Sequence, residues 1–352
     1  MAALTVGSAE VTAMRFGLFL LAAQFPGQDH TTVLDSTVAA AVAAEAAGFD
    51  DVWIAEHHFM SYGICPSAIT LAGYLLGATH RITVGTAVTV LSTQHPIAVA
   101  EQTALLDQLS GGRFRLGVGR GGPWIDLKVF GTGLERYQHG FAEALDLLLA
   151  ALTNPRLGAT GPRFRFSDID IVPRPYTHPR PEVIVAVTTA PTAKLAAQRG
   201  LPMLLGMHAN DSEKAALITH YQQFAAGQGR HLAASLAYVA DTQHEALTTM
   251  RNCLPRWLGP GLAGYRRADG NPHNRRDPHE YTELLCRLHP VGTAEHCRDT
   301  LTETARRTGI NHFLLLVEGT GDRARTLENI ARLGAEVIPS CKSTLHRGRQ
   351  IG

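Results

Sequence analysis

The chain has 352 residues, of which 45% are hydrophobic and 18% charged, and 32 basic residues against 31 acidic ones leave a formal charge of +1. This balance excludes a strongly basic nucleic-acid-binding protein and a polybasic protein of membrane surfaces. No apolar run approaches the roughly 18 residues that a membrane-spanning helix needs. We therefore expect a soluble globular protein that neither crosses a membrane nor binds nucleic acid.

The cysteines and the two ends of the chain indicate where the protein works and how it is divided. Five cysteines are odd in number, widely separated and never in a C-x-x-C pair: Cys65, Cys253, Cys286, Cys297 and Cys341. This pattern argues against a disulfide framework and a zinc knuckle and favours a reducing cytoplasm. Residues 1–13 lack the regions of a signal peptide and are expected to be a disordered leader, followed by one domain at 14–340 and a tail at 341–352.

Strand-like and helix-like patterns alternate along nearly the whole chain. The predicted strands are, in order, Arg15–Leu20, Asp51–Ala55, Ile82–Ala87, Arg113–Val118, Glu182–Val187, Pro202–Leu205, Leu232–Ala240 and His312–Glu318. Apolar residues at three- and four-residue spacing predict helices near 31–47, 67–78, 96–109, 136–152, 191–199, 212–227, 243–257, 293–308 and 323–336. Eight strand–helix repeats indicate an α/β fold whose parallel sheet closes into a (β/α)8 TIM barrel.

Two stretches interrupt the alternation. Residues 153–181 are rich in proline and predict an insertion with a small hairpin at Phe164–Phe166 and Ile169–Val172. Residues 258–280 are rich in Gly, Pro, Arg and Asn, and have too few apolar residues to pack. A loop of this length predicts either a mobile lid or a plain surface insertion.

The end of the second predicted strand carries a carboxylate and two imidazoles, Glu56, His57 and His58. Active sites of TIM barrels lie at such strand ends, and side-chain alternation lets one histidine face the barrel mouth while the other packs sideways. A zinc site would need a third ligand, such as His95 or His208, but no H-x-x-x-H or H-x-H spacing supports it, and we predict no metal. A general acid–base role for His57 is favoured because imidazole titrates near neutral pH, with two structural histidines as the alternative.

Two further strand ends have features of phosphate binding. The run from Gly117 to Gly122 matches G-x-G-x-x-G, but a proline and an irregular stretch follow where a dinucleotide-binding helix should open. Arg120 within this run instead suggests a phosphate held by backbone N–H groups and a guanidinium. Thr188, Thr189 and Thr192 supply hydroxyls at a predicted helix N-terminus, although threonine is also a common helix cap.

Many segments together resemble the flavin-dependent luciferase-like monooxygenases, and within them the catalytic alpha chain of bacterial luciferase. The resemblance runs in register from about residue 15 to residue 338. The segments that carry it are 16–20, 48–50, Trp53, 56–59, 74–79, 84–87, 95–96, 105–108, 112–115, 120–121, 129–132, 200–203 and 290–293.

The resemblance implies a site for reduced FMN and a role for one histidine. The implied cofactor-binding residues are Ala87, Val88, Gly119, Arg120, Thr188, Thr189, Ala190 and Thr192. Arg120 and the loop that follows the fifth strand would meet the phosphate, and the flavin ring would lie near Ala87, Val88 and Gly119. The Ala87–Val88 peptide bond is expected to be cis, and His57 to be the catalytic imidazole.

The implied reaction is oxygenation of a small organic molecule. Reduced FMN and O2 form a 4a-hydroperoxyflavin, and one oxygen atom passes to the substrate. The resemblance also implies a separate NAD(P)H-dependent flavin reductase, because the chain has no credible dinucleotide site. A homodimer is expected through the helices near 67–78 and 96–109, which carry small and apolar residues on more than one face.

Departures from luciferase refine these expectations. Gly119 stands where luciferase has a reactive cysteine, which should leave more space over the flavin ring. The lid region is shorter, which favours a bulkier substrate than a long-chain aldehyde, such as an intermediate of bacterial secondary metabolism in antibiotic biosynthesis. The alternatives are a deazaflavin-dependent oxidoreductase and a non-catalytic flavin-binding subunit, and the presence of His57 and of the Arg120-Gly121 pair favours catalysis.

Overall fold

The computed structural model describes residues 13–227, 229–273 and 275–347. Apart from Ala13, the expected leader at 1–13 lies outside the described residues. The expected boundary between domain and tail at residue 340 falls inside helix α13 (Ile338–Arg347). Cys341 is buried there, and Nζ of Lys342 lies 3.0 Å from Oδ1 of Asp50, so the helix packs on the body of the protein across that boundary.

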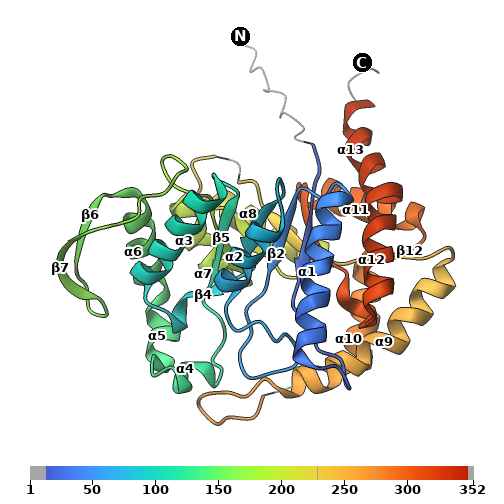
Figure 1. Ribbon diagram of the computed structural model, residues 1–352, viewed down its shortest axis with the longest axis horizontal. Coiled ribbons are helices and arrows are strands. Elements are labelled where there is room, and N and C mark those ends of the chain that lie inside the picture. The colour runs from blue at the N-terminus through green and yellow to red at the C-terminus, as the bar shows by residue number, and fades with distance from the viewer. Residues whose placement is uncertain (1–12, 228, 274, 348–352) are drawn as a thin grey trace.

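Eight parallel strands of the described chain form a closed barrel (Figure 1). They are β1 (Arg15–Leu20), β2 (Asp51–Ile54), β3 (Thr83–Thr86), β5 (Phe114–Gly119), β8 (Val183–Val187), β9 (Met203–Leu205), β10 (Leu232–Leu236) and β13 (His312–Leu316). The pairing of β1 with β13 and of β3 with β5 closes the sheet. The predicted (β/α)8 TIM barrel is confirmed.

The strands are mostly apolar because both faces of the sheet are covered. Every residue of β2, β10 and β13 is buried. The indole of Trp53 lies inside the barrel, where a Cβ at Gly85 would come within 2.6 Å of its ring. The missing side chain of this glycine therefore makes room for a large aromatic residue in the barrel core.

Helices surround the strands in Figure 1. The longer ones are α1 (His30–Ala46), α2 (Ala68–Ala78), α3 (Pro96–Ser110), α6 (Phe141–Thr153), α7 (Ala190–Gln198), α8 (Asp211–Gln222), α9 (Gln243–Ala263), α10 (Pro278–Leu288), α11 (Ala294–Thr308) and α12 (Arg323–Arg332). Short helical segments are η1 (Leu91–Thr93), α4 (Asp126–Val129), α5 (Gly133–His139), η2 (Glu318–Thr320) and the π-helical η3 (Leu333–Val337).

Three predicted elements are divided in the structure. The helix expected at 136–152 is α5 and α6 with a break at Gly140, where an added Cβ would lie 2.7 Å from the Arg136 carbonyl oxygen. The strand expected at Leu232–Ala240 is β10 followed by β11 (Tyr238–Val239), which leaves the barrel sheet to pair with β12 (Val291–Gly292). The helix expected at 323–336 changes from α12 to the π-helical η3 near its end.

The insertion at 153–181 contains a hairpin of β6 (Arg156–Thr160) and β7 (Arg165–Asp170), which projects from the body in Figure 1. The prediction of two strands at 164–166 and 169–172 is wrong, because the single strand β7 occupies most of this segment. The turn expected between them contained Ser167 and Asp168, but β7 is largely exposed and therefore accepts polar residues without ending. The observed turn lies at residues 161–163.

The stretch at 258–280 is more ordered than its composition predicted. Helix α9 continues through Pro255 and Pro260, because Leu254, Trp257 and Leu258 on one of its faces are buried. Helix α10 begins at Pro278, with Asp277 accepting hydrogen bonds from two N–H groups of its first turn. This leaves residues 264–273 and 275–277, which we call the lid, between the two helices at the lower end of the barrel in Figure 1.

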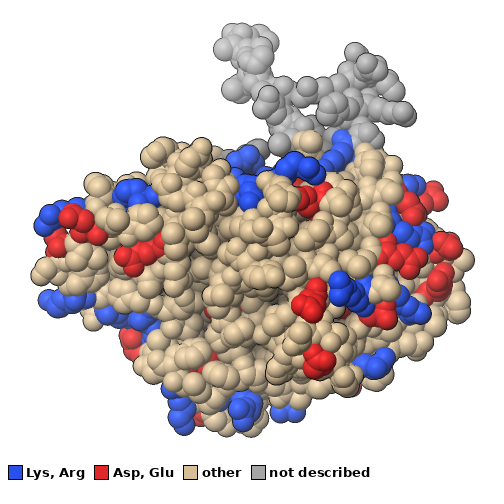
Figure 2. All heavy atoms as spheres, in the orientation of Figure 1, with Lys and Arg blue, Asp and Glu red and all other residues tan. Residues whose placement is uncertain are grey.

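Charged residues are mixed over the surface. In the view of Figure 2, acidic and basic side chains are interspersed and separated by wide uncharged areas. Across residues 13–227, 229–273 and 275–347, no helix combines the length and apolar content needed to cross a membrane.

Candidate active site

A cavity of about 540 Å³ lies at the carboxyl ends of the barrel strands. The barrel contributes strand-end residues such as Phe19, Glu56, His57, Ala87, Ala186 and Leu204, and the lid closes the cavity from the other side. This is the end at which TIM-barrel active sites are found, because the loops that follow the strands converge there.

His57 lines this cavity, as the sequence predicted. Its ring packs edge-on against Tyr62 at 5.1 Å and Tyr265 at 6.4 Å, measured between ring centroids. Burial and then the neighbouring His58 lower the pKa of His57 to about 4. Its Nδ1 is buried without a hydrogen-bond partner in the described part of the chain. At neutral pH the imidazole is therefore uncharged. Its Nδ1 faces Gly63, where an added Cβ would lie 2.8 Å from it.

His58 has different surroundings from His57. Its ring packs edge-on against Phe130 at 4.9 Å, and its Nε2 lies 3.6 Å from Oε1 of Glu56. Glu56 in turn accepts backbone hydrogen bonds from Val90 at 3.1 Å and Ala68 at 3.2 Å, which fixes the segment after β3 and the start of α2. Both histidines thus line the cavity, His57 against Tyr62 and Tyr265 and His58 between Glu56 and Phe130.

The segment after β3 bends toward the cavity. The Ala87–Val88 peptide bond is cis, as the family resemblance implied, and both residues line the cavity. The expectation of extra space at Gly119 is wrong, because a Cβ built there would lie 2.6 Å from Cγ2 of Val88. The valine side chain fills the volume that a larger residue at position 119 would occupy.

The residues predicted to bind phosphate form a connected group beside the cavity, which we call the polar corner: Arg120, Thr188, Thr189 and Thr192. Arg120 donates to Oγ1 of Thr192 at 3.0 Å, and the hydroxyls of Thr189 and Thr192 are 3.0 Å apart. Thr188 lines the cavity, Thr189 caps α7 without a side-chain hydrogen bond to it, and Ala190 is the first residue of this helix.

The polar corner has the chemistry of an anion site. The guanidinium of Arg120 lies 5.7 Å from the ring centroid of Tyr137 and makes no ion pair within the described ranges. Free guanidinium N–H groups, two hydroxyls and the N–H groups of a helix start are the donors that hold phosphate in proteins. The residues present therefore fit the phosphate of a flavin mononucleotide.

Several cavity residues were missed by sequence reasoning. They are Tyr62, Trp124, Asp126, Tyr265 and Tyr281. Burial raises the pKa of Asp126, which also accepts a hydrogen bond from the N–H of Leu127. An aromatic residue within a stretch rich in Gly and Arg was the signal available at Tyr265, because such a residue needs a packing partner.

Three other titratable residues lie near the strand ends: His95, Glu318 and His208. His95 caps α3 and packs edge-on against Phe164 at 5.2 Å. Glu318 accepts hydrogen bonds from the N–H groups of Leu21 and Ala23, and burial raises its pKa to about 7. His208 lines the cavity, but the described residues contain no group of three or more His, Cys, Asp or Glu side chains that could hold a metal ion.

Comparison with known sequences gives one family over most of the chain. The family described as luciferase-like monooxygenase matches residues 14–312. An alkanal monooxygenase alpha chain of Photorhabdus luminescens is 31% identical, with 94% of this chain and 97% of the relative covered. The alpha chain from the Kryptophanaron alfredi symbiont is 29% identical, covering 94% and 99% of the two chains.

Solved structures share the fold at lower identity. The monooxygenase RslO1 from Streptomyces bottropensis superposes with a TM-score of 0.82 at 20% identity, covering 93% of this chain and 99% of that one. The oxygenating constituent of 3,6-diketocamphane monooxygenase from Pseudomonas putida, in complex with FMN, gives 0.77 at 20% identity, covering 93% and 98%. An F420-dependent secondary alcohol dehydrogenase gives 0.74 at 18% identity, covering 94% and 99%.

Proposed function

Because this chain belongs to the luciferase-like monooxygenase family, we propose that it uses reduced FMN and O2 to oxygenate a small organic molecule. The observation that carries the proposal is the position of an uncharged, partly buried His57 in a cavity that borders the polar corner. The residues that we assign to proton transfer and to phosphate binding thus lie at the same end of one barrel.

The residues divide the work between binding and protection. Arg120, Thr189 and Thr192 would hold the FMN phosphate, and Ala87 and Val88 would lie against the flavin ring. Reduced FMN, when bound, supplies the electrons and the centre that activates oxygen. Trp124 and Tyr265, whose rings lie 4.9 Å apart, line the cavity and would limit the access of water to it.

His57 is the residue that we assign to proton transfer. A neutral imidazole carries one proton and one free lone pair, so it can donate at one ring nitrogen and accept at the other. Its lowered pKa of about 4 keeps it in that form at neutral pH.

Oxygen uptake tests the proposal directly. The purified chain, supplied with chemically reduced FMN and candidate aromatic, polyketide-like and aldehyde substrates, should consume O2 and give a product heavier by one oxygen atom. A cofactor titration runs beside it. Binding of an 8-hydroxy-5-deazaflavin with hydride transfer and no oxygen uptake would replace oxygenation by the deazaflavin alternative, and FMN binding without turnover of any substrate would favour a non-catalytic subunit.

We also propose a separate NAD(P)H-dependent flavin reductase as partner. After the G-x-G-x-x-G run the chain forms an irregular stretch and then the short α4, so the helix of a dinucleotide-binding fingerprint does not follow. The five free cysteines support a reducing, cytoplasmic location for both proteins. Turnover with NADH should require an added reductase and should proceed without it when FMN is reduced chemically.

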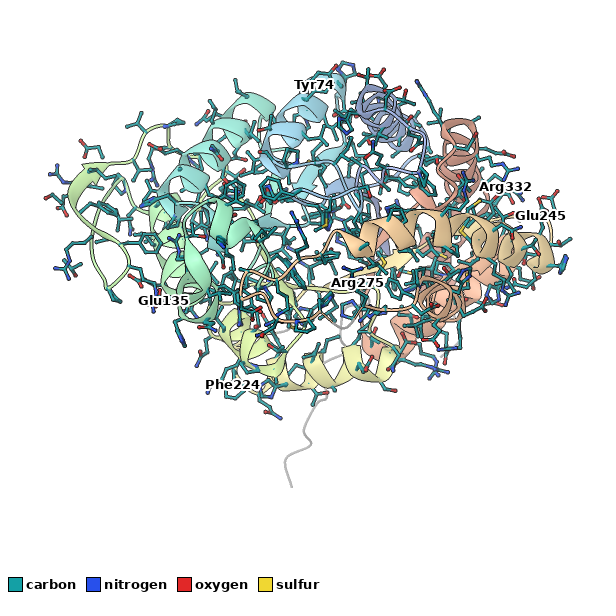
Figure 3. All side chains as sticks on the ribbon, turned by 90° about the horizontal axis from the view of Figure 1, so that it is seen from below. Tyr74, Glu135, Phe224, Glu245, Arg275 and Arg332 are labelled. Carbon is teal, nitrogen blue, oxygen red and sulfur yellow. The ribbon has the colours of Figure 1, made fainter. Side chains whose placement is uncertain are left out.

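A homodimer through α2 and α3 is supported by exposed apolar side chains. Tyr74, Leu105 and Leu109 are 65%, 48% and 76% exposed on these helices. Figure 3 shows Tyr74 at the outer edge of the barrel, away from the lid residue Arg275. Sedimentation should give a dimer at micromolar concentration and a monomer for the double variant Tyr74→Asp and Leu109→Arg, whereas a wild-type monomer would contradict the proposal.

The cavity suggests a bulky substrate from bacterial secondary metabolism, such as an intermediate of antibiotic biosynthesis. Its volume of about 540 Å³ and its aromatic lining suit a multi-ring molecule. The substrate panel of the oxygen-uptake experiment tests this choice, because preference for a long-chain aldehyde would contradict it.

A further inference from the structure

The lid places a group of cations, Arg266, Arg275 and Arg276, on the wall of the cavity. We propose that the substrate is an aromatic carboxylate and that Arg275 and Arg276 bind its carboxylate group. This inference rests on the proposed function, because it assigns a substrate class to the same cavity. Figure 3 looks onto this end of the barrel and shows Arg275 near the middle of it, on the segment between α9 and α10.

These arginines have no acidic partner in the part of the chain that the structure describes. Their neighbour Arg267, by contrast, pairs with Asp269 through Nε and Oδ1 at 2.9 Å. Asp277 follows Arg276 directly, but its carboxylate accepts hydrogen bonds from the N–H groups of His279 and Glu280 at the start of α10. The guanidinium groups at the cavity mouth therefore have no carboxylate partner among the described residues, and that of Arg276 hydrogen-bonds the side chain of Tyr281.

Two acidic residues also line the cavity, and neither pairs with an arginine of the lid. Glu56 accepts hydrogen bonds from the N–H groups of Val90 and Ala68, and Asp126 accepts one from the N–H of Leu127. Burial, followed by the charge of Arg276, lowers the pKa of His208 on the cavity wall. The lid side of the cavity is thus positive and attracts an anion.

The lid also offers flat surfaces for an aromatic body. The ring of Trp124 lies 4.9 Å from that of Tyr265 and 5.0 Å from that of His273. Aromatic side chains bind planar ligands by stacked and edge-on contacts. The guanidinium of Arg276 lies 4.8 Å from the ring centroid of Tyr281, and this contact orients the planar group.

The backbone of the lid is fixed where the arginines begin. The N–H of Ile125 donates to the carbonyl oxygen of Arg266 at 2.8 Å, and the N–H of Ala268 donates to that of Pro123 at 2.8 Å. At the other end of the lid, Asp277 fixes the chain directly after Arg276, because its carboxylate accepts hydrogen bonds from two N–H groups at the start of α10. A planar guanidinium held in this way binds a carboxylate through two parallel hydrogen bonds, which a lysine does not provide. The geometry therefore favours recognition of a carboxylate over recognition of a neutral carbonyl group.

Calorimetric binding of a matched pair of probes tests this proposal. The full chain, with and without reduced FMN under nitrogen, is titrated with 2-naphthoate and with its methyl ester, which has nearly the same shape and no charge. We expect 2-naphthoate to bind at least tenfold more tightly at low salt, with the preference shrinking as salt is raised. The double variant Arg275→Gln and Arg276→Gln should lose at least tenfold in affinity for 2-naphthoate and less than twofold for the ester.

Arg256→Gln is the matched control, because it removes one exposed cation of α9 that does not line the cavity. It should change neither affinity by more than twofold. Equal binding of the two probes, no binding of 2-naphthoate at millimolar concentration, or an equal loss in the control would overturn the proposal. A loss of FMN affinity in the double variant would also overturn it, since the arginines would then hold the cofactor.

The two proposals fail in different ways. An absence of oxygen uptake together with a retained preference for 2-naphthoate would reject the oxygenation and keep the anionic ligand. Oxygen uptake with substrates that carry no charge, together with equal binding of the two probes, would do the opposite.

Discussion

The two sides of the cavity are built from different parts of the fold. The polar corner joins Arg120 at the end of β5 to Thr192 in the first turn of α7, so its residues follow regular strands of the barrel. The lid lies between α9 and α10, and its position depends on hydrogen bonds with the loop at 123–125. The barrel itself therefore positions the proposed cofactor side. The proposed substrate side depends on the lid, which can vary without disturbing the sheet.

The largest effect is expected from substitution of His57, which lies between the two sides of the cavity. His57→Ala should lower substrate oxygenation by about 100-fold or more, the usual scale for loss of a general acid–base, and leave FMN affinity within a few-fold. Steady-state kinetics and a flavin titration measure the two quantities. His58→Ala is the control and should lower thermal stability more than turnover, because His58 packs against Phe130 and Glu56. The reverse pattern would exchange the roles of the two histidines.

Removing the cation of the polar corner should affect the cofactor side alone. Arg120→Ala should weaken binding of reduced FMN by roughly 2–3 kcal/mol, the scale of a lost charge-assisted contact with phosphate. Riboflavin, which has no phosphate, should bind the variant and the wild type with similar affinity. Equal losses for both ligands would place the phosphate elsewhere and would remove the division between the two sides.

A smaller effect is expected on the lid side. Tyr265→Ala removes ring contacts with Tyr62, Trp124 and His57, and should lower kcat/KM by about tenfold through lost substrate packing, equivalent to about 1.4 kcal/mol. FMN affinity should stay within twofold. Tyr176→Ala provides the control, because Tyr176 is exposed and does not line the cavity. A large loss of FMN affinity in Tyr265→Ala would show that the lid also serves the cofactor.

The smallest effect is expected on the free energy of unfolding, from a residue that lies on neither side of the cavity. His231 precedes β10 at the amino end of the barrel, and its Nδ1 accepts a hydrogen bond from the N–H of Met203 at 3.1 Å. Burial lowers the pKa of His231 to about 4, whereas an unfolded histidine titrates near 6.5. Between these pH values the unfolded chain takes up a proton that the folded chain does not, so the free energy of unfolding falls as pH falls from about 6.5 to about 4.

His231→Gln keeps a hydrogen-bond acceptor and removes this titration. Urea unfolding of the variant at several pH values should show a pH dependence shallower than that of the wild type by about 1 kcal/mol per pH unit in this window. An unchanged slope would assign the acid sensitivity to other buried groups, such as His289, whose pKa burial lowers to about 3.

The sequence by itself determined the barrel and indicated which residues meet in the polar corner, because both follow from local patterns. Strand and helix periodicity specify the βαβ order, and β1 was predicted with its observed limits at Arg15 and Leu20. Residues that end neighbouring parallel strands must meet at one edge, so Arg120 and Thr192 could be paired from their places in the order of elements. The family resemblance added the cis bond after Ala87, and it implied the role that we propose for His57.

Only the tertiary structure decided which neighbours those residues have. Val88 fills the volume at Gly119, His58 packs against Phe130, and the lid carries Arg275 and Arg276 to the cavity. A composition rich in Gly, Pro and Arg predicts a loop, because it lacks a periodic apolar face. The folded chain keeps α9 and α10 helical around the lid because their buried faces pack on the rest of the protein, and contacts between residues far apart in sequence leave no periodic signal in either segment.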